Sequence, residues 1–304
     1  MLKHSYAINI FAKDKMKLAQ KLVIEYFRAS LNLRAVISPN WAAKKAFVLF
    51  TSPRNRSRHP LPDIFKKGER ISFNHNGNLI RGYRWNKGGV KRLLVLHGYE
   101  STCRKFDHHI SRSIRLGYEV LAFDAPAHGE SEGRSVHALM YADMIRQAIM
   151  QFGKVNTFIC HSFGGIALSL YLETVEHNEH TKVAFIAPAT ETTSAINGFF
   201  RFLQLGGHIR KAFDQRIKNI SGQYPEHFSI KRAMTNIKAR ILWIHDENDQ
   251  VTPIDDVQPL FDQALPNIEF MITKGLGHNR IYRDNAVKKR LFSFISFDHT
   301  DALS

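Results

Sequence analysis

The chain contains 304 residues, 44% of them hydrophobic and 23% charged, which is the composition of a water-soluble globular protein with a substantial core. No apolar run reaches the roughly 18 residues that a membrane-spanning helix requires, and residues 7–12 lead into charged residues without the cleavage site of a secretory signal. The two cysteines, Cys103 and Cys160, exclude a disulfide framework and form no Cys-x-x-Cys pair. We therefore expect a cytoplasmic protein with reduced thiols and without a metal or other cofactor.

The formal net charge of +16 is unevenly distributed along the chain. Residues 1–70 contain 15 Lys and Arg against 4 Asp and Glu, so this first quarter carries a net charge of +11. Such a segment could contact an anionic membrane weakly, although a solvated basic face is the commoner reason for this bias. Because no nucleic-acid-binding motif accompanies the charge, nucleic acid is not an expected partner.

Two helices are predicted near the N-terminus, over residues 13–33 and 41–50. In both segments apolar residues recur near helical spacing, and lysines lie between them in the first. A basic connector, residues 54–62, follows. We predict that residues 1–68 form a helical basic extension that packs on a main domain of residues 69–304. Contact with a membrane surface is the alternative role for this extension.

The pattern changes to short strands from Glu69 onward. Residues 70–73 and 78–85 are expected to pair as a hairpin around an Asn76-Gly77 turn. Apolar strands and helical segments then alternate, with strands at 92–96, 118–123, 157–160, 182–186 and 241–244 and helices at 106–116 and 136–152. Uninterrupted apolar strands that alternate with helices predict a parallel sheet covered on both faces. Ligands of such sheets bind at the carboxyl ends of the strands.

Ser162 stands between an apolar strand and a helical pattern, with the small residues Cys160 and Gly164 two positions to either side. This is the pattern of a nucleophile elbow, a strained turn that lifts a serine oxygen clear of the sheet. Glycine is usual where Cys160 stands. Taken alone, a plain strand-to-helix turn is the commoner explanation of such a segment.

Five motifs at strand ends, in this order, resemble those of the α/β-hydrolase family over about residues 69–296. They are His97-Gly98, Asp124–Ser131, Cys160–Gly164, Ile244–Asp249 and Gly275–His278. Ala127 and Cys160 replace glycines of the family's pattern. The resemblance implies an α/β fold with a mostly parallel twisted sheet of about eight strands and helices on both faces. It also implies a short helical cap, at about residues 189–234, while the N-terminal extension lies outside the resemblance.

The resemblance assigns a catalytic triad to this chain. A serine hydroxyl is a poor nucleophile and needs a base to take its proton, so Ser162 is the candidate nucleophile and His278 the candidate base. A carboxylate must orient that histidine. Asp249 is the predicted acid, because the family's acid precedes a short apolar-Pro step, here Val251-Thr252-Pro253, and Asp246 is the alternative.

The resemblance also implies an oxyanion hole and a substrate pocket. The backbone amides of Tyr99 and Phe163 are the expected donors to a negatively charged intermediate. The candidate pocket residues are His97, Phe199, Phe200 and Phe202. Bracing its own turn by hydrogen bonds is the commoner role for a histidine placed as His97 is. The three phenylalanines are equally candidates for packing the cap on the sheet.

These features predict a serine hydrolase that cleaves a carboxylic ester or related acyl bond through an acyl-enzyme at Ser162, with a small acyl substrate whose acyl group is apolar. One alternative uses the same triad for acyl transfer, thioester cleavage, peracid formation or C–C bond hydrolysis. Another is a non-catalytic binding protein on the same fold. The haloalkane dehalogenase and epoxide hydrolase branches of the family carry an aspartate at the position of Ser162. A serine there argues against their chemistry. Neither the substrate nor the oligomeric state is predicted.

Overall fold

The computed structural model describes residues 18–54, 56 and 60–296 of the chain. Two units are distinguished, one comprising Pro53–Thr190 and Ser229–Ser304 and the other Met1–Ser52 and Glu191–Phe228. Among the described helices, none has the length and apolar character needed to cross a membrane. The expectations for residues 1–17, and for positions 55 and 57–59 of the connector, lie outside the described residues.

The larger unit is built on one eight-stranded sheet with the order β1-β2-β4-β3-β5-β6-β7-β8. β2 pairs antiparallel with both β1 and β4, and the other five neighbouring pairs are parallel. The strands are β1 (Glu69–His75), β2 (Asn78–Trp85), β3 (Lys91–Leu96), β4 (Tyr118–Phe123), β5 (Thr157–His161), β6 (Lys182–Ile186), β7 (Arg240–Asp246) and β8 (Ile268–Thr273). This mostly parallel sheet confirms the predicted fold class.

The antiparallel hairpin of β1 and β2 turns at Asn76-Gly77, as predicted. Both residues have positive φ, 50° and 76°, which is the backbone conformation of the tight turns that match the twist of a hairpin. The Asn74 side chain supports the turn, because its Oδ1 accepts a hydrogen bond from the Gly77 amide at 3.0 Å. A local signal of two residues therefore fixes the register of this edge of the sheet.

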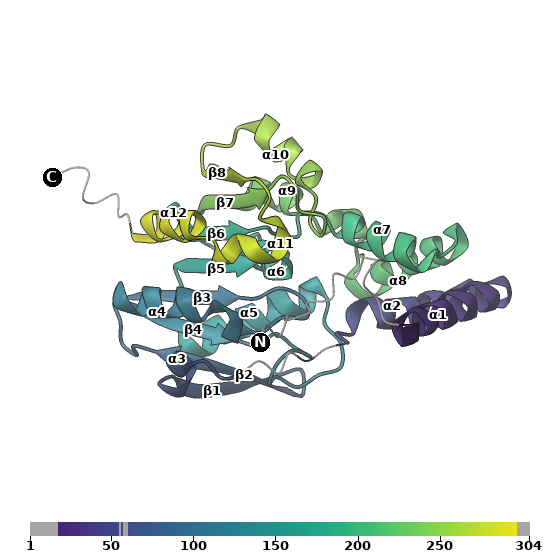
Figure 1. Ribbon diagram of the computed structural model, residues 1–304, viewed down its shortest axis with the longest axis horizontal. Helices are drawn as coiled ribbons and strands as arrows, with labels where there is room; N and C mark the ends of the chain where they lie inside the picture. Colours follow the sequence, from purple (N-terminus) through teal and green to yellow (C-terminus); the bar gives the residue numbers. More distant parts are fainter. Residues whose placement is uncertain (1–17, 55, 57–59, 297–304) are drawn as a thin grey trace. The chain divides into compact units, whose positions relative to one another are not determined.

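Helices cover both faces of the sheet (Figure 1). The helices on one face are α3 (Asp63–Lys66), α4 (Asp107–Arg115) and α12 (Asn285–Ser296), and those on the other are α5 (Ala138–Phe152) and α6 (Phe163–Leu172). The shorter helices of this unit include α9 (Ile230–Ala233), α10 (Gln258–Gln263) and α11 (Gly277–Arg280). On the first face Phe106 and Phe292 belong to one buried cluster with Leu93 of β3. Side chains alternate along a strand, so Leu94 points to the opposite face.

The smaller unit combines the N-terminal helices with helices of the predicted cap region. They are α1 (Leu18–Ile37), α2 (Pro39–Thr51), α7 (Thr192–Leu203) and α8 (Gly207–Ser221). Phe50 of α2 packs against Phe199 of α7 and Phe213 of α8, with ring centroids 5.3 and 5.9 Å away. Arg28 of α1 donates a hydrogen bond to the backbone oxygen of Phe202 at 3.2 Å. Two segments far apart in the sequence therefore share one core.

Each of the two N-terminal helices is longer than predicted at one end. The first extends further at its C-terminal end, and the second starts earlier. α1 continues to Ile37, and α2 begins at Pro39, because Ser38 caps the second helix through a 3.2 Å hydrogen bond from the Trp41 amide to its Oγ. Proline at the first helical position favours the same start. The docking of residues 1–68 on the main domain stays a prediction.

Candidate active site

Ser162 occupies a strained turn between β5 and α6. Its φ of 54° and ψ of −119° are unfavourable for any residue with a side chain, so neighbouring interactions must hold the turn. The Ser162 amide donates to Ile186 O at 3.2 Å, and Ser162 O accepts from the amides of Gly165 at 2.9 Å and Ala189 at 3.0 Å. These three hydrogen bonds join the turn to β6, to α6 and to the loop after β6.

The residues two positions from Ser162 explain why small side chains are required there. A Cβ on Gly164 would lie 2.8 Å from Leu96 O, closer than a carbon atom tolerates. Cys160 is fully buried in β5, and its Sγ lies 3.5 Å from Ala184 O as a weak donor. Burial raises the pKa of the Cys160 thiol well above its usual value, so the thiol stays protonated. Cysteine is therefore accommodated without loss of the strained turn.

The structure brings Ser162, His278 and Asp249 together from three separate loops. His278 Nε2 lies 3.0 Å from Ser162 Oγ, and His278 Nδ1 lies 2.8 Å from Asp249 Oδ2. An ionised carboxylate can only accept, so Nδ1 carries the proton and Nε2 faces the serine hydroxyl as an acceptor. His278 reaches this position in α11 after a loop in which Gly275 and Gly277 have φ of 81° and 60°.

Asp249 is held by the loop that follows β7. Its Oδ1 accepts hydrogen bonds from the amides of Val251 at 2.8 Å and Thr252 at 3.0 Å. Burial opposes ionisation of this carboxyl, but the hydrogen bond and charge of His278 and these two amides outweigh it, so the pKa of Asp249 is below its ordinary value. The group is a carboxylate at neutral pH, as an orienting acid must be.

Thr252 is a residue of this site that the sequence analysis did not single out. Its Oγ1 lies 2.9 Å from Asp249 Oδ2 and 3.2 Å from His278 Nδ1. It therefore contacts both members of the pair and restricts the orientation of the imidazole. The signal that could have indicated it is its place within the Val251-Thr252-Pro253 step.

Asp246, the alternative acid, has a different set of partners. Its Oδ1 accepts from the Asn248 amide at 3.0 Å, and its Oδ2 accepts from Thr273 Oγ1 at 2.8 Å and the Leu276 amide at 2.9 Å. Burial opposes its ionisation, yet these hydrogen bonds hold the pKa of Asp246 below its ordinary value. Asp246 thus connects the end of β7 to β8 and to the loop that carries His278.

His161, next to Ser162, contacts both the backbone and the ring of His278. His161 Nε2 donates to the backbone oxygen of His278 at 3.0 Å, and the two ring centroids are 4.6 Å apart. Burial, reinforced by the neighbouring His278, holds the pKa of His161 well below its ordinary value, so the ring is neutral. The Tyr282 ring also lies next to His161, with the ring centroids 5.0 Å apart.

The two predicted oxyanion donors belong to the loop after β3 and to the start of α6, next to Ser162. Phe163 is the first residue of α6, where a backbone N–H has no acceptor within the helix and the helix favours negative charge. A Cβ on Gly98, which precedes Tyr99, would lie 3.0 Å from Ser162 Cβ. The rings of Tyr99 and Phe163 are 5.8 Å apart. Their role in binding an oxyanion stays a prediction.

His97, a candidate pocket residue, is buried and braces the loop after β3. Its Nδ1 donates to Gly98 O at 2.7 Å, and its Nε2 accepts from the Ala125 amide at 2.9 Å. Burial lowers the pKa of His97 to about 4, so the imidazole is neutral and can serve one donor and one acceptor. Both ring nitrogens are therefore engaged in joining the loops after β3 and β4.

The other three candidate pocket residues lie on α7 in the smaller unit. Phe199, Phe200 and Phe202 are all buried there. The Phe200 ring lies 5.2 Å from Phe213 and 5.9 Å from Phe199, so two of the three belong to the aromatic core of that unit. Contact with a substrate stays a prediction for these residues.

Comparisons with known proteins agree with this architecture. Residues 90–224 match the family model described as serine aminopeptidase, S33. A search of curated protein sequences found no match. An esterase from Pyrococcus furiosus is 20% identical, with 81% of this chain and 97% of that chain covered and a TM-score of 0.60.

Two further solved structures extend the similarity to other organisms. Mouse α/β hydrolase domain-containing protein 10 is 17% identical, with 78% of this chain and 100% of that chain covered and a TM-score of 0.55. An esterase from Exiguobacterium antarcticum is 18% identical, with 73% and 97% covered and a TM-score of 0.52. The sheet order and these matches show that the chain has the α/β-hydrolase fold. The α/β-hydrolase fold that the strand-end motifs imply is thereby confirmed.

Proposed function

We propose that the chain is a serine hydrolase that cleaves a carboxylic ester or a related acyl bond through an acyl-enzyme at Ser162. The observation that carries this proposal is the continuous hydrogen-bonded path from Ser162 Oγ through His278 to Asp249, with distances of 3.0 and 2.8 Å. Nucleophile and base within hydrogen-bond reach, with the base oriented by a third group, is the arrangement that activates a hydroxyl.

In the proposed reaction, Ser162 Oγ attacks the acyl carbon while His278 Nε2 takes the hydroxyl proton. Asp249 accepts the Nδ1 hydrogen bond and stabilises the imidazolium that forms. The amides of Tyr99 and Phe163 receive the negative charge of the tetrahedral intermediate. His278 then returns the proton to the leaving alcohol, and the same steps with water release the acid from Ser162.

The strained backbone of Ser162 supports this role. A non-glycine residue held at positive φ by hydrogen bonds to three neighbouring segments is costly, and such strain concentrates at functional sites. The charge states of the neighbouring groups also support this role. His161 is neutral and its Nε2 is engaged as a donor, and Asp249 is ionised, which leaves His278 as the base next to Ser162.

Labelling with a fluorophosphonate probe tests the nucleophile directly. The probe should label the folded protein, and Ser162→Ala should abolish labelling while lowering kcat by about five to six orders of magnitude. Ser111→Ala, at a serine on α4 outside the site, is the matched control and should label as the wild type does. Absence of labelling in correctly folded wild-type protein would exclude the acyl-enzyme.

A substrate panel then tests the scissile bond. We expect turnover of short-chain p-nitrophenyl esters to exceed that of an acyl thioester and of an aminoacyl p-nitroanilide. The anilide is included because the matching family model describes an aminopeptidase. Preference for the thioester or the anilide would overturn the ester assignment while keeping Ser162. The chain would instead be a transferase if the probe labels Ser162, no ester is hydrolysed, and added hydroxylamine accepts the acyl group.

A further inference from the structure

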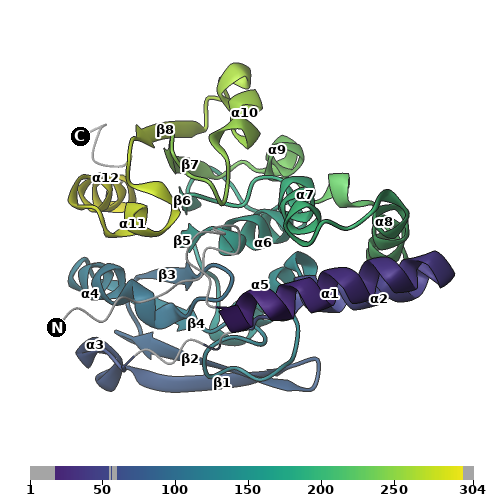
Figure 2. The same cartoon turned by 45° about the vertical axis from the view of Figure 1, so that its right-hand side comes forward.

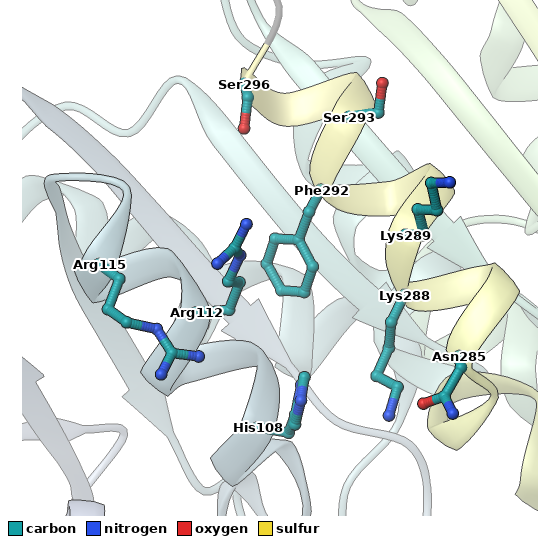
Figure 3. Close-up of a pocket in the computed structure, with 9 residues that line it drawn as sticks. All are labelled: His108, Arg112, Arg115, Asn285, Lys288, Lys289, Phe292, Ser293 and Ser296. Atoms are coloured by element: carbon teal, nitrogen blue, oxygen red, sulfur yellow. The ribbon is translucent and has the colours of Figure 1, made fainter.

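A groove between α4 and α12 of the larger unit is lined mainly by basic side chains (Figure 3). Its volume is about 460 Å³, and its basic residues are His108, Arg112 and Arg115 of α4 and Lys288 and Lys289 of α12. None of its nine lining residues is Asp or Glu. The two helices lie on the same side of the sheet in both overall views (Figures 1 and 2). We call this feature the α4–α12 groove.

A second cavity adjoins the α4–α12 groove, and we call it the inner cavity. Its volume is about 340 Å³, and it shares His108 and Lys288 with the groove. Arg104, Lys105 and Arg283 add three further cationic side chains, of which Arg104 pairs with Glu130. Asp107 is the single acidic residue among those that line the cavity. In Figure 3 the side chains of His108 and Lys288 lie next to each other at the end of the groove. The cations therefore continue from one cavity into the other.

His109 lines the inner cavity and is a buried side chain without hydrogen-bond partners. It is 2% exposed, and neither ring nitrogen has a partner in the part of the chain that the structure describes. Its ring lies among those of Phe106, Tyr282 and Phe292, with centroids 5.4 to 6.5 Å away. Both nitrogens of the buried His97, by contrast, are engaged. Buried polar groups are nearly always paired, so His109 calls for a partner beyond the residues that the structure describes.

The cations around these cavities destabilise one another. Burial, and next the charge of Arg283, hold the pKa of Lys105 below its ordinary value. Burial and the charge of Lys288 do the same to the pKa of His108. Among the described residues, no carboxylate forms an ion pair with Arg112 or Lys288. A bound anion would supply the missing opposite charge, because it attracts every one of these groups at once.

We propose that the α4–α12 groove and the inner cavity together bind a small anion that carries two or more phosphoryl groups. One phosphoryl group lies in the inner cavity and pairs with Lys105 and Arg283. It accepts a hydrogen bond from His109 after the imidazole rotates to bring one of its buried nitrogens to the cavity. The next lies in the groove between Arg112 and Lys288. Guanidinium and ammonium groups are the side chains that recognise phosphoryl oxygens most often.

The buried position of His109 favours a small molecule over a nucleic acid. A phosphodiester is flanked by sugars on both sides, whereas the terminal phosphoryl group of a small molecule can enter the inner cavity by itself. Ser162, Asp249 and His278 are absent from the residues that line either cavity. The inferred site is therefore separate from the candidate active site, and the inference does not depend on the proposed hydrolase activity.

Calorimetric titration of the full chain with inorganic tripolyphosphate tests the inference. At about 150 mM salt, where exposed charges are largely screened, we expect a dissociation constant of about 1–100 µM. Orthophosphate, which fills one half of the site, and citrate, which carries carboxylates, should bind at least about tenfold more weakly. The absence of binding at about 1 mM tripolyphosphate, or equal binding of citrate, would overturn the proposal.

Charge-removing variants locate the binding. Arg112→Gln and Lys288→Gln should each weaken tripolyphosphate binding about tenfold, the effect of one charge-assisted hydrogen bond. Arg290→Gln is the matched control, because Arg290 lies on α12 outside both cavities and pairs with Glu269. It should weaken binding by less than about twofold. Equal weakening by all three substitutions would mean general attraction to a basic surface and would exclude the site.

The His109 imidazole supplies an independent readout. In protein with ¹⁵N-labelled histidine, tripolyphosphate should shift the His109 ring signals, which the volume-conserving variant His109→Phe identifies by their loss. If that variant does not fold, His109→Gln serves the same purpose. Saturating tripolyphosphate that leaves the His109 signals unchanged would refute the assigned pose. Tighter binding of an oligothymidylate than of tripolyphosphate would show that the ligand is nucleic acid instead.

Discussion

His161 Nε2 donates a hydrogen bond to the backbone oxygen of His278 at 3.0 Å, while the next residue, Ser162, faces the ring of the same histidine at 3.0 Å. Two consecutive residues of the elbow therefore contact His278 at two different points, one on its backbone and one on its ring. The strained turn that presents the serine also fixes the loop that presents the base. Their alignment is consequently supported by a direct hydrogen bond between segments 117 residues apart.

His161→Phe should lower kcat about fivefold to tenfold with little change in KM, because it keeps the ring packing and removes one hydrogen bond. His161→Asn, which retains a donor near the same position, should recover part of the loss. The comparison is made by steady-state kinetics on the best p-nitrophenyl ester. Wild-type kcat in the phenylalanine variant would show that the bond does not position His278.

Asp249, in the loop that follows β7, and Asp246, at the end of β7, should have different roles, one in catalysis and the other in stability. Asp249→Asn should lower kcat about 10⁴-fold, because an amide cannot hold the imidazole in the required tautomer. Asp246→Asn should retain most of the activity but lower the free energy of unfolding by about 1–3 kcal/mol, since an amide nitrogen would face the donors of Thr273 and Leu276. Kinetics and urea unfolding distinguish the two effects. The opposite pattern would make Asp246 the catalytic acid.

Gly164 should not tolerate a side chain. In Gly164→Ala the new Cβ would meet Leu96 O at 2.8 Å, so the elbow must shift, and we expect a loss of about 1–3 kcal/mol in stability together with most of the activity. Gly207→Ala is the control, because a Cβ at Gly207 meets no atom within 4 Å. It should be neutral or slightly stabilising in thermal unfolding. A fully active Gly164→Ala enzyme would contradict the tight approach at the elbow.

His109 should make the folded state sensitive to acid. Burial, together with the charges of His108 and Lys288, lowers the pKa of His109 to about 3 from 6.5. Between these values the unfolded chain binds a proton that the folded chain does not, so stability is complete above pH 6.5 and declines as the pH falls. From pH 7 to pH 5 the free energy of unfolding of the wild type should fall by about 2 kcal/mol relative to that of His109→Phe.

The control for this effect is His180, whose side chain is 74% exposed. His180→Gln should leave the difference between pH 7 and pH 5 unchanged from the wild type, as measured by urea unfolding at both values. If His109→Phe has the same pH dependence as the wild type, then His109 is protonated in the folded protein or is reached by water.

The sheet could be predicted in detail because its strands are continuous apolar runs bounded by polar residues. The strands at 118–123 and 182–186 are found with the predicted bounds. β8, in which Glu269 interrupts the apolar residues, was not delimited, because it is an edge strand with a partly exposed pattern. Burial on both faces leaves a strong signal in a sequence, and burial on one face leaves a weak one.

The candidate site was predicted through motifs that stand at strand ends, which is why Ser162, Asp249 and His278 could be named. The positions of Thr252 and of the unpartnered His109 could not be inferred in the same way. Thr252 lies within the Val251-Thr252-Pro253 step, but its contact with His278 joins two segments whose register is set by the whole fold. The surroundings of His109 are likewise set by the packing of distant segments. Sequence motifs report which side chains a reaction needs, whereas the neighbours that orient them follow from packing.

The packing of Phe50 against Phe199 has a consequence for the order in which the protein can be made. These two residues belong to one core, yet about 150 residues separate them, which a ribosome adds in roughly 10–30 s. During that time α1 and α2 have left the ribosome without the helices that bury their aromatic side chains. The N-terminal segment is therefore exposed to proteases, chaperones and other nascent chains until α7 and α8 emerge, because the core of the smaller unit cannot close before then.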